Sequence, residues 1–212
     1  GDGCLMEGVS HEAIDFAGHL GLGHLIVMWD DNRITIDGDT DLATSTDQMA
    51  RFASAGWHVL SCDGHNTTEI GDAIEAARLD PRPTMIACRT TIGYGAPNKQ
   101  GGHDVHGAPL GGDEIAATRA NLGWQHPPFE IPQEVYAAWA KIAKRGSKKR
   151  AKWDIKVLSS PARDAFHAQL AQDVTPLAEA MSAYKAQLIA DKPKVATRKA
   201  SEMAVNVVNE AL

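Results

Sequence analysis

Two short polar motifs near the amino end carry residue types that bind a hard metal ion. Asp2 lies between two glycines, and Asn32 follows it thirty residues later, just after an apolar run that ends at Asp30. A carboxylate and a side-chain amide oxygen suit Mg²⁺ or Ca²⁺, and a backbone carbonyl such as that of Ile34 adds another oxygen ligand. Magnesium keeps open positions for phosphate oxygens, so a site with few protein ligands indicates a metal that clamps a diphosphate.

The residues around Asp2 fit an anionic ligand as well. Gly1 and Gly3 would let the backbone approach that ligand closely, and a helix starting near Glu7 would aim its amides at the anion. The alternative is that Gly-Asp-Gly is only a turn and Asp31-Asn32 only a loop after a strand. The pairing of the two motifs across one predicted βαβ unit favours the metal site.

The elements that must position these motifs alternate in type along the chain. Three short apolar runs predict buried strands, at residues 25–30, 58–62 and 84–89. Helical patterns lie between them, at residues 7–22, 47–55 and 67–79. This alternation predicts an α/β fold in which a parallel sheet has helices on both faces. If a strand ends at Gly1, Asp2 and Asn32 lie on neighbouring strand ends, where such sheets bind ligands.

A glycine-rich segment, Thr90 to Gly112, follows the third predicted strand. It holds seven glycines in 23 residues, together with His103 and His106, and is typical of a functional loop. The H-x-x-H spacing suggests zinc, but no third or fourth ligand lies at a plausible spacing. We interpret these residues as catalytic-loop histidines, because an imidazole can donate a hydrogen bond to a substrate oxygen near neutral pH.

The rest of the chain is predicted to be helical. A short helix is expected at residues 113–122, another after Pro132, two more helical patterns separated at Pro176, and a last helix at residues 197–212. Lys141 to Lys152 carries seven basic residues in twelve, which we interpret as a solvated helix-and-linker surface. The predicted organisation is a partial cofactor domain at 1–130, a helical linker at 131–192 and the start of another domain at 193–212.

Composition narrows the class of protein. The chain has 212 residues, of which 43% are hydrophobic and 23% charged, with a mean hydropathy of −0.27 and no apolar run of membrane-spanning length. A net charge of −6 argues against an obligate nucleic-acid binder. Three scattered cysteines favour a reducing, cytoplasmic compartment. The start at Gly1, without an initiator Met, suggests a chain cut at that end, and the last helix suggests a cut at the other, although a split-gene subunit is the alternative.

Four ordered segments resemble the transketolase family. They are GDGCLMEG at residues 1–8, DDNRITIDG at residues 30–38, the pair TTIGYG and VHGAP at residues 90–95 and 105–109, and ATRKASE at residues 196–202. The first two look like the thiamine-diphosphate motif in its transketolase form. The last resembles the opening of that family's pyrimidine-binding domain. The resemblance implies a thiamine-diphosphate-binding fold, and it is strongest over residues 1–130.

Carried over residue by residue, the resemblance implies a role for each site position. Asp2, Asn32 and the carbonyl of Ile34 would hold Mg²⁺ or Ca²⁺, and Gly3 and Asn32 would contact the diphosphate, with Gly1 beside them. Glu7 matches a glutamate at the subunit interface that links two cofactor sites, although a first-turn glutamate favoured by the helix dipole is an equal alternative.

Three further residues are implied to contact substrate. His106 matches the catalytic histidine that touches both the cofactor and the sugar, and His103 is a weaker candidate for substrate binding. Arg198 matches the arginine that binds the phosphate end of the sugar, a task for which a guanidinium fork is suited.

The implied reaction is transfer of a two-carbon ketol unit from a ketose phosphate to an aldose phosphate, in the pentose phosphate pathway. The family resemblance also implies a cytoplasmic homodimer with the cofactor at the subunit interface, and no nucleic-acid or membrane partner. Other family segments needed for catalysis are absent from the 212 residues, so we expect this chain alone to be inactive. The alternatives are a dihydroxyacetone or deoxyxylulose-phosphate synthase, or a non-catalytic cofactor-binding subunit.

Overall fold

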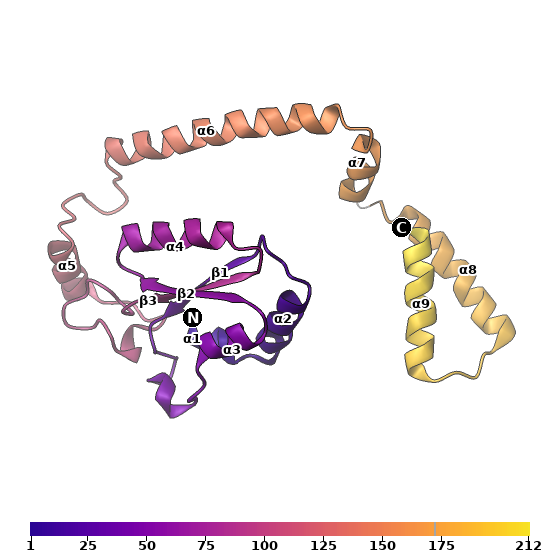
Figure 1. The fold of residues 1–212 in the computed structure, drawn as a ribbon, viewed down its shortest axis with the longest axis horizontal. Coiled ribbons are helices and arrows are strands. Elements are labelled where there is room, and N and C mark those ends of the chain that lie inside the picture. Colours follow the sequence, from indigo (N-terminus) through magenta and orange to yellow (C-terminus); the bar gives the residue numbers. More distant parts are fainter. Residues whose placement is uncertain (172) are drawn as a thin grey trace. The chain divides into compact units, whose positions relative to one another are not determined.

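The computed structural model describes residues 1–171 and 173–212. Its internal contacts divide the chain into two compact units, residues 1–128 (unit 1) and residues 129–212 (unit 2). Figure 1 shows strands only in the first of them. Each unit is described by itself below.

Unit 1 alternates helices and strands. Its elements are α1 (Asp2–Met6), α2 (Gly8–His19), β1 (Ile26–Asp31), the 3₁₀ turn η1 (Thr40–Leu42), α3 (Gln48–Ser54), β2 (His58–Asp63), α4 (Thr67–Leu79), β3 (Thr84–Arg89), the 3₁₀ turn η2 (His103–Val105) and α5 (Gly112–Asn121). The three strands form one parallel sheet in the order β1-β3-β2. This confirms the predicted α/β fold with a parallel sheet. The strands end together, since Asp31 and Asp63 both lie opposite Arg89.

Helices cover both faces of the sheet, as predicted (Figure 1). On one face, α2 and α3 pack a cluster in which Phe52 meets Trp57 edge to face, with ring centroids 5.0 Å apart. The indole nitrogen of Trp57 donates a 2.9 Å hydrogen bond to the carbonyl of Ile14 in α2. On the other face, Ala73 and Ala77 of α4 pack against β2 and β3. The central strand β3 is buried from Thr84 to Cys88.

Side-chain caps fix where two of the helices begin. The Asp47 carboxylate accepts a 2.9 Å hydrogen bond from the amide of Ala50 at the start of α3. The Asn66 side chain accepts hydrogen bonds from the first-turn amides of α4. Each cap satisfies backbone donors that have no partner inside the helix. These short polar signals explain why the boundaries of α3 and α4 follow the predicted ranges closely.

The amino end differs from the prediction. The helix expected at residues 7–22 is confirmed as α2, but a further short helix, α1, precedes it, and the extended backbone of Glu7 (ψ 140°) separates the two. Gly1, expected at the end of a strand, directly precedes α1. The strand-end geometry is therefore replaced by a short helix that contacts β1. Asp2 reaches the end of β1 from this helix.

Unit 2 contains four helices in the part of the chain that the structure describes. They are α6 (Gln133–Leu158), α7 (Arg163–Ala171), α8 (Thr175–Asp191) and α9 (Thr197–Ala211). The two helical patterns expected on either side of Pro176 are α7 and α8, and Pro176 itself lies in the first turn of α8, where proline is tolerated. Helices α8 and α9 pack together. No helix described in the chain is both long and apolar enough to cross a membrane.

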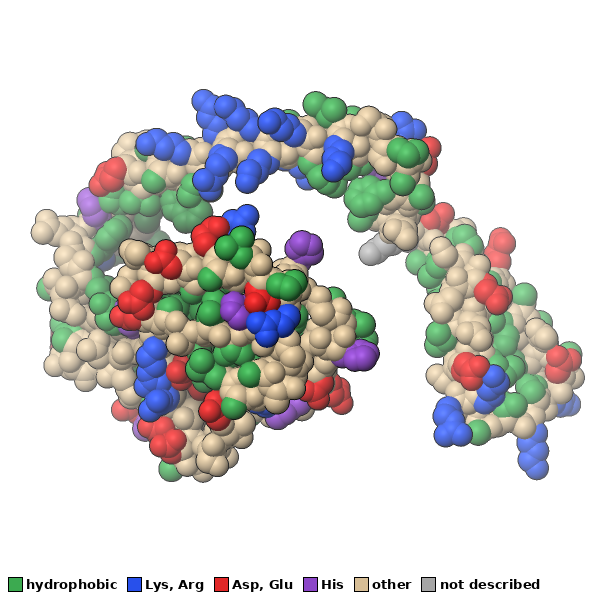
Figure 2. All heavy atoms as spheres, viewed as in Figure 1, with side chains coloured by type: hydrophobic (Ala, Val, Ile, Leu, Met, Phe, Trp, Pro, Cys, Tyr) green, Lys and Arg blue, Asp and Glu red, His purple; other side chains and the backbone are tan. Residues whose placement is uncertain are grey.

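The predicted basic surface lies entirely within α6. Figure 2 shows its lysine and arginine side chains gathered along this helix. Lys144 and Lys148 are four residues apart, so they share one face of the helix. Arg150 instead contacts its own neighbours: its guanidinium lies 4.8 Å from the ring centre of Trp153 and pairs with Asp154.

Candidate functional site

The carboxylate of Asp2 is buried next to the end of β1. Asp2 is only 7% exposed, and its Oδ2 accepts a 3.2 Å hydrogen bond from the amide of Arg33. The structure thus brings together two motifs that lie thirty residues apart in the sequence. Burial, followed by the neighbouring charge of Asp31, raises the pKa of Asp2 above its ordinary value. Both effects disfavour the carboxylate form, and a bound cation would relieve both.

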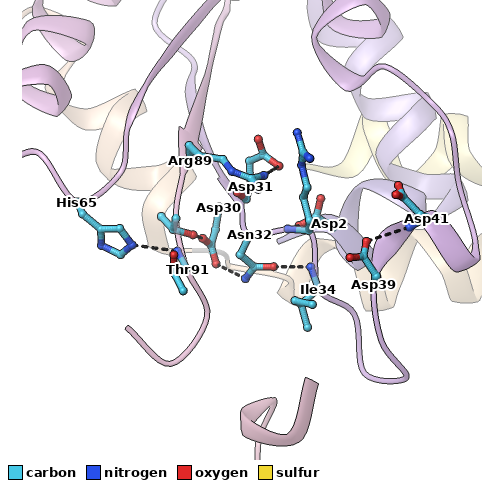
Figure 3. Close-up of polar contacts among 12 residues, drawn as sticks. Asp2, Asp30, Asp31, Asn32, Ile34, Asp39, Asp41, His65, Arg89 and Thr91 are labelled. Carbon is cyan, nitrogen blue, oxygen red and sulfur yellow. Dashed lines mark hydrogen bonds and ion pairs between the residues drawn. The ribbon is translucent and has the colours of Figure 1, made fainter. Parts of the chain in front are cut away.

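Asn32 follows β1 and is held by hydrogen bonds at both ends of its side-chain amide. Its Nδ2 donates to Oδ2 of Asp30 at 3.1 Å, and its Oδ1 accepts from the amide of Ile34 at 2.9 Å (Figure 3). The oxygen therefore lies on the side of Ile34. A carbonyl-type oxygen has two lone pairs, so this bond leaves room for a second partner.

The backbone turns sharply between Asn32 and Ile34. Arg33 has a left-handed backbone (φ 61°), which is uncommon for a residue with a side chain. Ile34 then faces Asp39 in an isolated antiparallel bridge, flanked by two backbone hydrogen bonds of its neighbours. In such a pair the N–H and C=O of the central residue point outward together. The carbonyl of Ile34 is thus directed to the same side as its N–H, which meets Asn32.

The glycines beside Asp2 border open space. A Cβ atom added at Gly1 or Gly3 would meet no atom within 4 Å, outside the immediate neighbours. Glu7 is exposed and serves as the N-cap residue of α2, without a side-chain capping bond. The backbone beside the predicted metal ligands is therefore accessible to a ligand.

A polar cavity of about 400 Å³ opens next to Asp2. Its wall includes Trp29 and Asp31 from β1 and hydroxyl side chains from the segment 40–47. Among the described residues, Trp29 Nε1 and Gln48 Oε1 are buried without a hydrogen-bond partner, and both residues line this cavity. Sequence reasoning missed the segment 40–47, because serines and threonines in a loop have no characteristic spacing.

The glycine-rich loop is tied to the ends of the strands. Thr90 donates a hydrogen bond to Oδ1 of Asp30, at the end of β1. The amide of Thr91 donates to Nε2 of His65 at 2.9 Å, and the His65 ring stacks on Tyr94 with centroids 3.9 Å apart. His65 was missed in the sequence. Its position just after β2 is the signal that would have found it, since strand ends gather at the ligand-binding edge.

The middle of this loop is fastened to α5. The carboxylate of Glu114 accepts hydrogen bonds from the backbone and side-chain amides of Asn98, each at 2.9 Å. These bonds hold the pKa of Glu114 below its ordinary value. Glu114 and Asn98 are sixteen residues apart and belong to no motif that we recognised, so sequence reasoning did not pair them.

The predicted substrate residues are placed as follows. His103 begins η2 and His106 directly follows it, and the amide of His106 donates to the carbonyl of His103 at 2.8 Å. Both histidines are exposed, and His103 lies 3.4 Å from the carboxylate of Asp104. Neither imidazole forms a hydrogen bond with the predicted metal ligands in the part of the chain that the structure describes. Arg198 lies in the first turn of α9, in unit 2, and is also exposed.

The donor set defines the chemistry of the site. Asp2 supplies a carboxylate, Asn32 an amide oxygen and Ile34 a backbone carbonyl, which together suit a hard divalent cation. Within residues 1–171 and 173–212, no group of three or more His, Cys, Asp or Glu side chains is arranged to hold a metal ion. Unit 1 is thus an α/β domain that brings Asp2 against the turn after β1, at the carboxyl end of a parallel sheet.

Comparison with known proteins gives the family. A family model described as "Transketolase, thiamine diphosphate binding domain" matches residues 1–179. The chain belongs to this family. The resemblance to transketolase in the segments between residues 1 and 109 therefore reflects true membership.

Individual relatives agree. The chain is 69% identical over 212 residues to a transketolase of Cereibacter sphaeroides and 50% identical to one of Sinorhizobium medicae (strain WSM419). All of this chain is matched in both cases, but only 32% and 30% of those proteins. The chain thus spans about a third of the length of the curated relatives it matches.

Solved structures are similar over the same extent. The crystal structure of transketolase from Campylobacter jejuni has a TM-score of 0.81 at 31% identity, and the match covers 98% of this chain and 32% of that one. Transketolase from Leishmania mexicana has a TM-score of 0.77 at 34% identity, and the match covers 100% of this chain and 32% of that one.

Proposed function

We propose that this chain is the part of a transketolase that holds the diphosphate of thiamine diphosphate through a divalent metal ion. One observation carries the proposal: the structure brings the buried Asp2 carboxylate against the turn that presents Asn32 and Ile34. The other two proposed ligands, the amide oxygen of Asn32 and the backbone carbonyl of Ile34, belong to this turn. Their mixture of carboxylate, amide and carbonyl suits Mg²⁺ or Ca²⁺.

The site has the electrostatic character that such a cation needs. Asp2 is buried beside Asp31, so its negative charge is poorly solvated and is repelled by a neighbour. A divalent ion would compensate the charge of Asp2 and leave coordination positions for diphosphate oxygens. Gly1 and Gly3, with open space beside them, would let the backbone approach the same anion.

The proposed reaction of the complete protein is transfer of a two-carbon ketol unit between sugar phosphates, in the pentose phosphate pathway. Bound thiamine diphosphate would supply the carbanion-stabilising chemistry of that reaction. His106, with His103 as a second candidate, would donate hydrogen bonds to sugar oxygens from the exposed η2 turn. Arg198 would bind the phosphate end of the sugar through its guanidinium.

The wider assembly is also part of the proposal. We propose that the complete protein is a cytoplasmic homodimer, in which Glu7 lies at the subunit contact that links two cofactor sites. Residues 131–192 would serve as a linker, and residues 193–212 would open the pyrimidine-binding domain. Because the chain spans about a third of its relatives, we expect no ketol transfer by the 212 residues alone. Measurable transfer by the purified chain, from xylulose 5-phosphate to ribose 5-phosphate, would contradict this.

Calorimetry tests the metal assignment directly. Titration of Mg²⁺ into the chain with excess thiamine diphosphate should show binding that is weakened at least about a hundredfold in Asp2→Ala, because the only carboxylate ligand is removed. Asp72→Ala is the matched control, since Asp72 is an exposed carboxylate on α4. Equal affinity in wild type and Asp2→Ala would overturn the assignment.

A further inference from the structure

The proposed metal site depends on which way the side-chain amide of Asn32 points. Only its oxygen can bind a cation, because the NH₂ group is a donor without a free lone pair. A surface amide can turn over and exchange the two ends. Something must therefore hold the oxygen toward the metal position.

The two neighbours of Asn32 permit one orientation only. Its Nδ2 faces the Asp30 carboxylate at 3.1 Å, and its Oδ1 faces the amide N–H of Ile34 at 2.9 Å. Turning the amide over would set an oxygen against a carboxylate and an NH₂ group against an N–H. Two hydrogen bonds would be replaced by two repulsive contacts, so the orientation is selected from both sides.

Asp30 is itself anchored. Its second carboxylate oxygen, Oδ1, accepts a hydrogen bond from the hydroxyl of Thr90, at the start of the glycine-rich loop. Asp30 lies in β1 directly opposite Cys88 of β3, so the carboxylate bridges the ends of two neighbouring strands. Figure 3 shows Asp30 between Asn32 on one side and Thr91 on the other.

We propose that Asp30 is a positioning residue that orients the Asn32 amide for the metal ion, without touching the metal itself. This inference rests on the proposed function, because it concerns the same metal site. A hydrogen-bonded partner that orients a metal ligand typically changes metal affinity by about tenfold to a hundredfold when it is removed. Since Asp30 is exposed, we expect the lower end of that range.

The substitution Asp30→Asn separates orientation from charge. The new side-chain amide can accept from Asn32 Nδ2 through its oxygen and donate to the Thr90 hydroxyl through its NH₂ group, because a hydroxyl both donates and accepts. The geometry around Asn32 is then preserved, while one negative charge near the metal is lost. Asp30→Ala loses both the charge and the geometry.

The test is titration of Mg²⁺ into the chain with excess thiamine diphosphate, for wild type and both variants. We expect Asp30→Ala to weaken Mg²⁺ binding about tenfold and Asp30→Asn to stay within about twofold of wild type. Asp72→Ala, an equal loss of charge on α4, should leave the affinity unchanged. Equal losses in Asp30→Asn and Asp30→Ala would show that Asp30 acts by charge, and would overturn the proposal.

A second measurement needs no metal. In the metal-free chain, NMR should show slow exchange of the Asn32 side-chain amide protons in wild type and Asp30→Asn, and fast exchange in Asp30→Ala. Unchanged exchange in Asp30→Ala would overturn the positioning role. If Asp2→Ala leaves Mg²⁺ binding intact, the proposed metal site is wrong. The NMR measurement still decides whether Asp30 orients the Asn32 amide. Circular dichroism confirms that each variant is folded.

Discussion

The two units of the chain differ in what they bury. Unit 1 packs clusters of buried apolar residues on both faces of its sheet, whereas no residue described in unit 2 is buried. They differ in charge as well. Residues 1–128 carry eighteen acidic and seven basic side chains, and residues 129–212 carry nine acidic and fourteen basic ones. The net charge of −6 hides two parts of opposite sign.

This difference explains where a precise site can be built. A side chain that must hold a metal ligand within a few tenths of an ångström needs a support that does not move. In unit 1, the ends of β1 and β3 are fixed by parallel hydrogen bonding and by the packing of helices on both faces. The helices of unit 2 offer no such support by themselves. Their exposed apolar side chains include Trp139 and Ile189.

Removing a core side chain is expected to give the largest contrast between the units. Phe52 is 1% exposed, so Phe52→Ala should lower the free energy of unfolding of unit 1 by about 3–5 kcal/mol. Trp139→Ala, at a tryptophan 67% exposed on α6, should change it by less than about 0.5 kcal/mol. The free energy of unfolding of unit 1 is measured for both variants by urea unfolding, which is monitored through the hydrogen exchange of the β3 amides. Similar losses in the two variants would refute the contrast.

A tryptophan-to-phenylalanine substitution in each unit tests the same difference between buried and exposed side chains with a smaller change. Trp57→Phe removes the hydrogen bond to the Ile14 carbonyl and shortens a side chain that is 3% exposed. We expect a loss of about 1–2 kcal/mol. Trp153→Phe in α6, where the indole is 44% exposed, is the control and should be close to neutral. The same urea experiment applies, and a larger loss for Trp153→Phe would reverse the comparison.

Most of the fold of unit 1 could be predicted from local patterns. Apolar runs located the three strands, and helical patterns located α3, α4 and α5. The strands, α3 and α4 each bury apolar residues, and α3 and α4 also begin at polar caps. The prediction at the amino end was wrong. Gly1, expected at the end of a strand, instead precedes the short helix α1, and no residue type in GDGCLMEG signals that helix.

Only the part of the site that depends on the spacing of residues along the sequence could be predicted. The thirty residues between Asp2 and Asn32 indicated that they meet, and the structure brings their segments together. The contacts of Asp30 with Thr90, and of His65 with Thr91, join segments 60 and 26 residues apart. Such pairs depend on the strand order β1-β3-β2, which a pattern of alternating elements does not determine.

The anchoring of the glycine-rich loop, in unit 1, should depend on pH. Hydrogen bonds from Asn98 hold the pKa of Glu114 below its ordinary 4.5. The stabilisation is therefore fully present above that ordinary pKa and is lost as the pH falls through the lower folded-state pKa. Glu114→Gln should remove this pH dependence. It should also speed the backbone amide exchange of residue 98 at neutral pH, because the NH₂ group of the glutamine side chain then faces an N–H donor of Asn98.

The control for this pH effect lies on α6. Asp154 forms an exposed i, i+4 pair with Arg150, so Asp154→Asn should have little effect at any pH. Amide exchange measured by NMR from acidic to neutral pH compares the two variants. The anchoring role fails if exchange near Asn98 has the same pH dependence in wild type and Glu114→Gln.

The smallest expected effect is a gain in stability, and it lies in the proposed metal site. Burial and the charge of Asp31 raise the pKa of Asp2. The folded state therefore holds a proton more tightly than the unfolded chain, and stability falls as the pH rises through the folded-state pKa. Asp2→Asn removes that cost while its amide oxygen still accepts from Arg33. At neutral pH without metal, we expect the Tm to rise by about 1–3 °C.

In the presence of Mg²⁺ and thiamine diphosphate, the wild type should have a higher Tm than Asp2→Asn. The wild type should then gain stability by binding, whereas Asp2→Asn should gain little, because a ligand stabilises the state that binds it. Thermal unfolding at acidic and at neutral pH, with and without Mg²⁺ and cofactor, checks both statements. If the Tm of Asp2→Asn without metal at neutral pH is equal to or below that of wild type, the charge of Asp2 does not destabilise the folded chain. An observed rise would show that unit 1 supports a binding carboxylate at the expense of its own stability.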